Sequence, residues 1–276
     1  MQILTVSRLV GSYGDEIAAK VAERMGLEFV GRNGLHELAM TCDPEYSDAC
    51  GLYETEHGPG FFERLFFDRP SYKSLFEALT FEQASRGNVV IVGRGAQVVL
   101  HDQPGVFCVH VVAPREIRIE RVEKRLACSR EEAEHYLDKY DGERANVIKA
   151  VFGRDPNDWS LYDLVFNTTH FTPDSATEVV LQAMTGMIRV PDQEGVRERF
   201  KSLGVAKRIE ALVRKKVTSA VARNVEIVPE PGGVMRLTGR IREKADKERV
   251  EKIATEYPGV TRVENDLKVT EITFGV

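Results

Sequence analysis

A chain of 276 residues with 42% hydrophobic and 29% charged residues has the composition of a globular protein large enough for two domains. Its 38 basic and 43 acidic residues give a net charge of −5, so no global positive field exists and no nucleic-acid partner is expected. The four cysteines show no zinc-ligand spacing, and there is neither a signal-peptide pattern nor a long apolar run, so we predict no metal cluster and a cytoplasmic protein.

Short apolar segments alternate with long helical patterns in the first two thirds of the chain. The segments are ILTVS, NVVIVG, VFCVHVV and DLVFNT, at residues 3–7, 88–93, 106–112 and 163–168. Strands that are apolar on both faces are typical of a parallel sheet covered by helices on both sides. We therefore expect an α/β fold with a doubly wound parallel sheet and right-handed crossovers.

Two stretches interrupt this alternation. Residues 40–70 combine proline, glycine and several aromatics without clean periodicity, which predicts a mobile, partly helical insertion. Residues 189–204 are polar and contain a proline and a glycine, which predicts a linker. The chain is thus expected to have a first domain at 1–188 and a second at 205–271.

The second domain shows a helix, a hairpin, a second helix and a strand, which predicts a small α+β module of the order α-β-β-α-β. Residues 205–223 carry an apolar stripe at helical spacing, made of Ile209, Leu212, Val213, Val217 and Val221. The segments VEIVP and VMRLTGRI flank a Pro-Gly-Gly turn, as in a β-hairpin. KADKERVEKIATEYPG then predicts the second helix, and VTRVENDLKV predicts the last strand.

A glycine-bearing turn follows the first predicted strand and precedes the first predicted helix. It reads Gly11-Ser12-Tyr13-Gly14. Backbone N–H groups at such a turn can bind an anion with the helix dipole behind them, and glycine allows phosphate to approach closely. A G-x-x-G pattern also occurs in strand-to-helix turns without a ligand, so on this pattern alone both interpretations stay open.

The cation that usually closes a phosphate-binding loop is missing. Where Gly-Lys-Ser/Thr would stand, the chain reads Gly14-Asp15-Glu16. Glu16 suits the first turn of a helix, whereas Asp15 would place a negative charge beside the phosphates. Arg8 comes immediately before the loop and could fold over the phosphates instead.

Further arginines could supply positive charge. Arg94 follows an all-apolar strand between two glycines, at the strand end where α/β sheets bind ligands, so we predict that it contacts a ligand. Arg118, Arg121 and Arg125 share one helical face. For Arg121 and Arg125 we favour a solvated face paired with neighbouring glutamates.

Residues 1–185 resemble the cytidylate kinase-like branch of the nucleoside-monophosphate kinases. The resemblance rests on the strand that runs through Ser-Arg into Gly-Ser-x-Gly, and on NVVIVGRGAQVVL, APREIRIERVEKR, DGER and DWSLYDLVFNT. It implies a P-loop NTPase-type fold. In that branch an arginine often stands where this chain has Asp15.

The resemblance also implies an activity, in which ATP phosphorylates a CMP-like nucleoside monophosphate with Mg²⁺ bridging the phosphates. Arg118 and Arg144 are the implied catalytic residues, because lid arginines place positive charge on the transferring phosphoryl group. Arg94 would hold the acceptor's phosphate, and Asp141 would either orient Arg144 or help to hold a metal. The residues expected to bind nucleotide phosphates are Arg8, Gly11, Ser12, Tyr13, Gly14 and Arg94.

Residues 205–271 resemble a BON domain, through GGVMRLTGRI, PGVTRVEN and DLKV. This resemblance implies an anionic phospholipid or a protein as partner. Five basic residues of the first helix could face anionic headgroups, although we favour a solvated polar face on a packed helix. They are Lys207, Arg208, Arg214, Lys215 and Lys216.

Three hypotheses about function follow. The leading one is a nucleoside-monophosphate kinase. The second is a nucleotide-binding or sensory protein without catalysis, in which the BON-like module provides the output. In the third, the BON-like module is the functional part and the large domain is structural.

Overall fold

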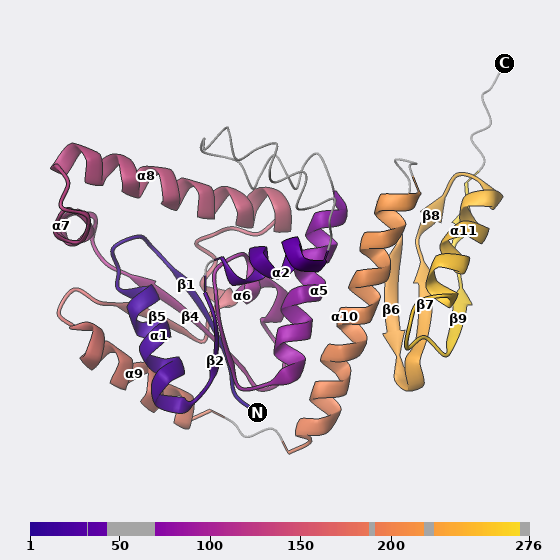
Figure 1. The fold of residues 1–276 in the computed structure, drawn as a ribbon, viewed down its shortest axis with the longest axis horizontal. Coiled ribbons are helices and arrows are strands. Elements are labelled where there is room, and N and C mark those ends of the chain that lie inside the picture. The colour runs from indigo at the N-terminus through magenta and orange to yellow at the C-terminus, as the bar shows by residue number, and fades with distance from the viewer. Residues whose placement is uncertain (32, 43–69, 188–190, 218–223, 271–276) are drawn as a thin grey trace. The chain divides into compact units, whose positions relative to one another are not determined.

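A computed structural model describes the chain except for residues 32, 43–69, 188–190, 218–223 and 271–276 (Figure 1). The chain divides into two compact units, one of Met1–Arg64 and Arg86–Val196, the other of Leu65–Ser85 and Arg197–Val276. Nearly all of the insertion predicted at 40–70 lies outside the described residues.

The first unit is built on a parallel sheet of five strands in the order β2-β3-β1-β4-β5, which confirms the predicted fold class. The strands are β1 Ile3–Arg8, β2 Glu28–Val30, β3 Val89–Val92, β4 Val106–Val112 and β5 Leu164–Asn167. Four of them coincide with the predicted apolar segments. The edge strand β2 was not predicted, because only one of its three residues is buried and it therefore forms no apolar run.

Helices follow the strands in the alternating manner expected of a doubly wound sheet (Figure 1). Those of the first unit are α1 Gly14–Met25, α2 Gly34–Cys42, α6 Ala96–Leu100, α7 Arg115–Leu126, α8 Arg130–Asn146 and α9 Pro173–Thr185. Short helical turns lie at Val147–Val151 and Trp159–Leu161. Helix α1 buries Ile17 and Val21 in a core with β1, β3 and β4, which sets the direction in which its N-terminus points.

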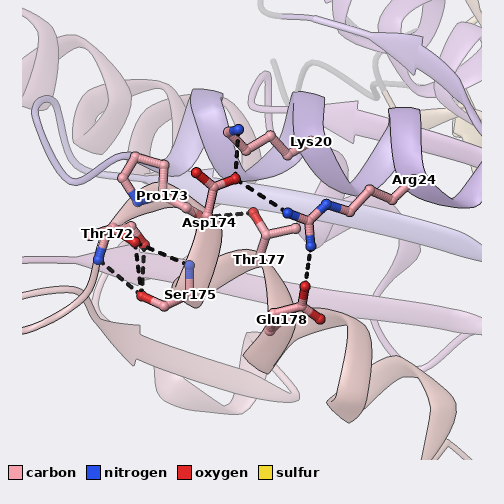
Figure 2. Close-up of polar contacts among 8 residues, drawn as sticks. All are labelled: Lys20, Arg24, Thr172, Pro173, Asp174, Ser175, Thr177 and Glu178. Atoms are coloured by element: carbon pink, nitrogen blue, oxygen red, sulfur yellow. Dashed lines mark hydrogen bonds and ion pairs between the residues drawn. The ribbon is translucent and has the colours of Figure 1, made fainter.

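Charged side chains also tie α1 to α9 (Figure 2). Lys20 Nζ lies 2.7 Å from Asp174 Oδ1, and Arg24 Nη2 lies 3.2 Å from the same oxygen. Arg24 also pairs with Glu178 one turn further along α9, which begins with a capping box at Thr172. Because these groups are exposed, each pair contributes little to stability, but the shared carboxylate restricts how the two helices can slide along each other.

The second unit contains the module predicted for the C-terminal residues. Strands β6 and β7 form an antiparallel hairpin, β9 pairs parallel with β7, and the short β8 pairs with β10. The elements are α5 Pro70–Arg86, α10 Gln193–Lys216, β6 Glu226–Glu230, β7 Val234–Thr238, β8 Arg240–Ile241, α11 Lys244–Thr255, β9 Arg262–Asn265 and β10 Lys268–Val269. None of the helices in the described ranges combines the length and the apolarity needed to cross a membrane.

The segment predicted as a linker, 189–204, is largely helical, because α10 already begins at Gln193. Its apolar positions Val196 and Phe200 are buried four residues apart among charged neighbours, which is too sparse a stripe to have been recognised. The domain limits of 1–188 and 205–271 themselves stay a prediction.

Helix α5 belongs to the second unit although it lies between β2 and β3 in the sequence. Its Phe81 ring stacks on Phe200 of α10 with the centroids 6.2 Å apart. Arg208 of α10 forms a bidentate ion pair with Glu82 of α5. Its Nε donates to Oε1 at 2.6 Å and its Nη2 donates to Oε2 at 2.8 Å. A side chain at Gly204 would come within 3.3 Å of Glu82, so glycine lets the two helices approach closely.

A buried carboxylate, Glu210, lies at the centre of the polar contacts between α5 and α10. Its side chain is 1% exposed. Lys207 Nζ lies 3.0 Å from Oε2 and Arg214 Nη2 lies 3.4 Å from the same atom. Ser74 Oγ donates to Oε2 at 3.4 Å, and the N–H of Ile227 donates to Oε1 at 3.3 Å. Every lone-pair direction of this carboxylate is therefore engaged by a group of the same unit.

Three of the five basic residues named for α10 are thus used differently from both interpretations of the sequence, whereas Lys215 and Lys216 are exposed. Lys207 also pairs with Glu77 of α5 at 3.3 Å. Burial by itself would lower the pKa of Lys207, but the carboxylates of Glu77 and Glu210 outweigh it and raise that pKa. Lys207, Arg208 and Arg214 face α5, where they neither reach a headgroup nor form a solvated face. The sequence did not reveal this because the partners on α5 lie more than a hundred positions away.

Candidate active site

The turn between β1 and α1 lies where the sequence predicted a phosphate-binding loop. Gly11 has φ +75° and a Cβ there would come 2.7 Å from the carbonyl oxygen of Arg118, so only glycine fits. Tyr13 has a left-handed conformation directly before α1. The hydroxyl of the buried Ser12 donates to the carbonyl of Leu9 at 2.7 Å, so this side chain holds the turn itself. An anion would therefore meet the backbone N–H groups at the start of α1.

An ion pair behind the loop holds the peptide groups on both sides of Val10. Asp141 Oδ1 accepts from the N–H of Val10 at 3.0 Å, and Oδ2 lies 2.6 Å from Arg118 Nη1. The same Nη1 donates to the carbonyl of Val10 at 3.1 Å, and Arg118 Nε donates to Ala113 O at 3.0 Å. Arg118 is 7% exposed. Asp141 thus hydrogen-bonds to the loop and to Arg118, and its charge also acts on Arg144.

We expect Asp141→Asn to lower the free energy of unfolding by about 2 kcal/mol, because an amide N–H₂ would face Arg118 and leave a partly buried guanidinium unpaired. Urea unfolding of the full chain measures this loss. Asp138→Asn is the matched control, since its pair with Arg115 joins the same two helices at 2.6 Å but is exposed. Equal losses in the two variants would contradict the anchoring of the loop by Asp141.

Arg121 contacts the loop from α7. Its Nη1 donates to Gly11 O at 3.2 Å and to Thr168 Oγ1 at 2.9 Å, and its guanidinium lies 3.8 Å from the centroid of the Tyr13 ring. The prediction of a solvated face was wrong for Arg121, because its partners come from the loop and from the end of β5 rather than from neighbouring glutamates. Arg125, one turn further, is exposed and lies over the ring of Tyr136 at 5.9 Å.

Arg8, the last residue of β1, turns toward the first residues of α1. Its Nε donates to Asp15 Oδ1 at 3.0 Å, and its Nη2 lies 2.7 Å from the same oxygen. The side chain of Arg8 is 13% exposed and that of Asp15 is 53% exposed. The acidic residue that replaces the expected lysine is therefore paired with the arginine that precedes the loop.

Arg144 of α8 brings a buried positive charge to this part of the unit. Its Nε and Nη1 are buried and have no hydrogen-bond partner among the described residues. Burial lowers the pKa of Arg144, and the charges of Arg8 and Arg118 act in the same direction, whereas Tyr162 and Asp141 oppose it. An arginine remains protonated at neutral pH all the same, so these N–H groups are buried donors to which no described residue offers an acceptor.

Two aromatic side chains lie beside these arginines. The imidazole of His110 on β4 stacks on the ring of Tyr162, with centroids 4.8 Å apart and planes at 19°. Burial, with the charge of Arg144, lowers the pKa of His110 to about 4, so the ring is neutral at pH 7. Sequence reasoning did not single out His110, because a histidine within an apolar strand looks like a core residue.

Arg94 lies in the turn that follows the carboxyl end of β3, the strand that pairs with β1. Gly93, Arg94 and Gly95 have φ values of +75°, +53° and +76°. A Cβ at Gly95 would come 2.2 Å from the ring of Phe152, so the turn has room for a side chain only at Arg94. A left-handed conformation at a non-glycine residue is strained and is often found at functional sites.

The predicted site residues thus divide into two groups. The loop residues, Arg8 and Arg94 lie at the carboxyl ends of β1 and β3, next to the topological switch point of the sheet, and the charge of Arg8 acts on Arg144 of α8. Arg118 lies behind the loop and is engaged with it. In the described part of the chain, no group of three or more His, Cys, Asp or Glu side chains is placed to hold a metal ion.

A parallel sheet of this strand order, with a glycine-bearing loop between β1 and α1 and arginines at the same edge, defines a P-loop kinase-type fold. The model of the cytidylate kinase-like family matches residues 3–170, and the model of the BON domain matches residues 206–271. The chain belongs to the cytidylate kinase-like family and carries a BON domain, as the sequence motifs indicated.

Known proteins align with the N-terminal part of the chain. The cytidylate kinase of Methanopyrus kandleri is 27% identical over 198 residues, which cover 69% of this chain and 96% of that protein. The cytidylate kinase of Pyrococcus horikoshii is 28% identical, with 71% and 95% covered. A crystal structure of an uncharacterized protein from Eubacterium ventriosum shares the fold, with a TM-score of 0.54 and 19% identity over 68% of this chain and all of that one. The N-terminal part is therefore kinase-like.

Proposed function

We propose that this chain is a nucleoside-monophosphate kinase that transfers the γ-phosphoryl group of ATP to a cytidylate-like acceptor. The observation that carries the proposal is the buried Nε and Nη1 of Arg144, which have no hydrogen-bond partner among the described residues and lie close enough to Arg8 and Arg118 to be affected by their charges. A buried donor without a partner costs about 1–3 kcal/mol, so its retention indicates a ligand that accepts hydrogen bonds there. Transferring phosphoryl groups carry such acceptor oxygens.

The donor nucleotide would bind at the loop. The N–H groups at the start of α1 and the helix dipole would attract the polyphosphate, and Arg8 would contribute a charge. Mg²⁺ would be held chiefly by the phosphate oxygens and water, as is usual for this ion, because Asp15 is paired with Arg8. Its charge would lower the barrier by neutralising the phosphates.

The acceptor would bind with its phosphate at Arg94, and one of its phosphate oxygens would attack the γ-phosphorus. A bond from that oxygen to phosphorus forms as the bond to the bridging oxygen of ADP breaks. Arg144 would donate to the γ-oxygens, whose charge shifts during the transfer. We assign Arg118 to holding the loop in place, because its Nε and Nη1 already donate to groups of the protein.

The second candidate is a nucleotide-binding protein without turnover. The observation that favours it is the carboxylate of Asp15 beside the loop, which adds negative charge where phosphates would bind. In that case the BON domain would respond to bound nucleotide. A role of this domain in binding anionic phospholipid would have to use groups other than Lys207, Arg208 and Arg214, since these face α5.

A coupled assay with ATP, Mg²⁺ and each nucleoside monophosphate in turn tests the proposal. We expect turnover of a pyrimidine monophosphate on the order of 1–100 per second, as is typical of kinases. The Arg94→Ala, Arg144→Ala double variant should lose it, whereas Arg125→Ala, an exposed arginine on α7, should keep it. Wild-type turnover no faster than that of the double variant would refute a kinase, and nucleotide binding without turnover would support the second candidate.

A further inference from the structure

The residue that stands in place of the expected lysine, Asp15, has a defined partner. Its Oδ1 accepts a hydrogen bond from Nε of Arg8 at 3.0 Å and lies 2.7 Å from Nη2. A guanidinium has five N–H donors on three edges, and Asp15 occupies only the edge between Nε and Nη2. One N–H of Nη1 and the second N–H of Nη2 form another edge, which has the geometry that binds two phosphate oxygens.

Two glycines make room for this arrangement. A Cβ at Gly14 would come 2.4 Å from Arg8 Cβ and 2.7 Å from its Cγ, so a side chain at that position would displace Arg8. A Cβ at Gly93 would come 2.8 Å from Arg8 Nη1. The guanidinium therefore lies between the start of α1 and the turn after β3, with its Nη1 end against that turn.

We propose that Asp15 is a positioning residue, which holds Arg8 so that the free edge of its guanidinium faces the donor phosphates in place of the missing lysine ammonium. The inference rests on the proposed function for the identity of the anion. Gly14 and Gly93 contribute to the same arrangement, because a side chain at either position would clash with Arg8.

The sign of the effect of Asp15 depends on two opposing contributions. Its negative charge repels phosphate, but the carboxylate is half exposed at the N-terminus of α1, where water screens it and the helix dipole offsets it. In return it immobilises a long, flexible side chain before the ligand arrives, and preorganisation of this kind increases affinity. Arg8 is largely buried, so its charge is screened less than that of Asp15. We therefore expect the gain in affinity from positioning Arg8 to exceed the loss from repulsion between Asp15 and the phosphates.

Calorimetric titration of ATP with Mg²⁺ into the full chain tests this. We expect Asp15→Asn to weaken binding roughly fivefold, through loss of preorganisation. Glu16→Gln is the matched control, because it removes the same charge one residue further along the first turn of α1, and it should bind ATP no more weakly than the wild type. In an Arg8→Ala background, Asp15→Asn should no longer weaken binding, since a double-mutant cycle isolates the coupling of the two residues.

The possible outcomes separate this inference from the proposed function. ATP binding that is unchanged or tighter in Asp15→Asn would overturn the positioning role, as would a loss that persists without Arg8. A chain that binds ATP with the expected coupling but turns over no nucleoside monophosphate would leave the inference standing and refute the kinase. A wild-type chain that binds no ATP would overturn both.

Discussion

Replacing Arg144 by alanine is expected to lower kcat for phosphoryl transfer about 10³-fold, the loss typical when an arginine that contacts the transferring group is removed. Without nucleotide, the same variant should unfold at the same or a higher denaturant concentration than the wild type. The reason is that two buried N–H groups of Arg144 have no partner among the described residues, so the free protein bears their desolvation cost without a hydrogen bond in return. Steady-state kinetics and urea unfolding measure the two effects.

Arg118→Ala provides the contrast for Arg144→Ala. Arg118 is buried and hydrogen-bonds to Val10 of the loop, to Ala113 and to Asp141, so its removal should lower stability as well as activity. Arg144→Lys keeps the charge but lacks the planar fork, and we expect it to recover only part of the activity. If Arg144→Ala proved as destabilising as Arg118→Ala, Arg144 would be a structural residue. Its buried N–H groups would then no longer support the proposed function.

The second large effect is expected in the other unit, where Glu210→Gln should lower the free energy of unfolding by about 3 kcal/mol. The carboxylate is buried and is shared by Lys207, Arg214, Ser74 and the N–H of Ile227. A neutral amide would leave Arg214 without a carboxylate partner and Lys207 with Glu77 alone, and would turn an N–H₂ group toward one of these cations. Thermal unfolding of the full chain measures the loss as a decrease in the Tm of this unit.

Glu226→Gln is the control for Glu210→Gln. Glu226 makes the same charge change on β6, next to Ile227, but its side chain is exposed. We expect this variant to unfold like the wild type, since exposed substitutions rarely change stability much. A small effect of Glu210→Gln, no larger than that of Glu226→Gln, would show that the polar contacts between α5 and α10 do not stabilise the unit.

Both predictions rest on charges whose partners the sequence does not indicate, and α5 shows why. It lies within residues 1–188, which the sequence assigned to the first domain. The structure places it in the second unit, with Phe81 against Phe200 and Glu82 paired with Arg208. Buried residues occur around its whole circumference, so no polar face in the sequence marked which neighbour it would have.

The arginines of α7 likewise show that the sequence does not indicate the partners of charged side chains. Arg118, Arg121 and Arg125 share a helical face in the sequence, yet one is buried behind the loop, one contacts the loop and Thr168, and one is exposed. A helical pattern gives the direction of a side chain relative to its own helix. It does not reveal which acceptors of other segments lie in that direction, and these decide whether an arginine binds a ligand or supports the backbone.

The sequence by itself determined the parallel sheet, the position of the glycine-bearing loop and the α-β-β-α-β module, because burial on both strand faces, turn chemistry and alternation are local properties of the chain. Only the tertiary structure decided that Asp15 pairs with Arg8, that Asp141 and Arg118 hold Val10, and that α10 takes its ionic partners from α5. The acceptors of a charged side chain depend on which segments the fold brings within about 3 Å, and that choice is made by packing between elements distant in the sequence.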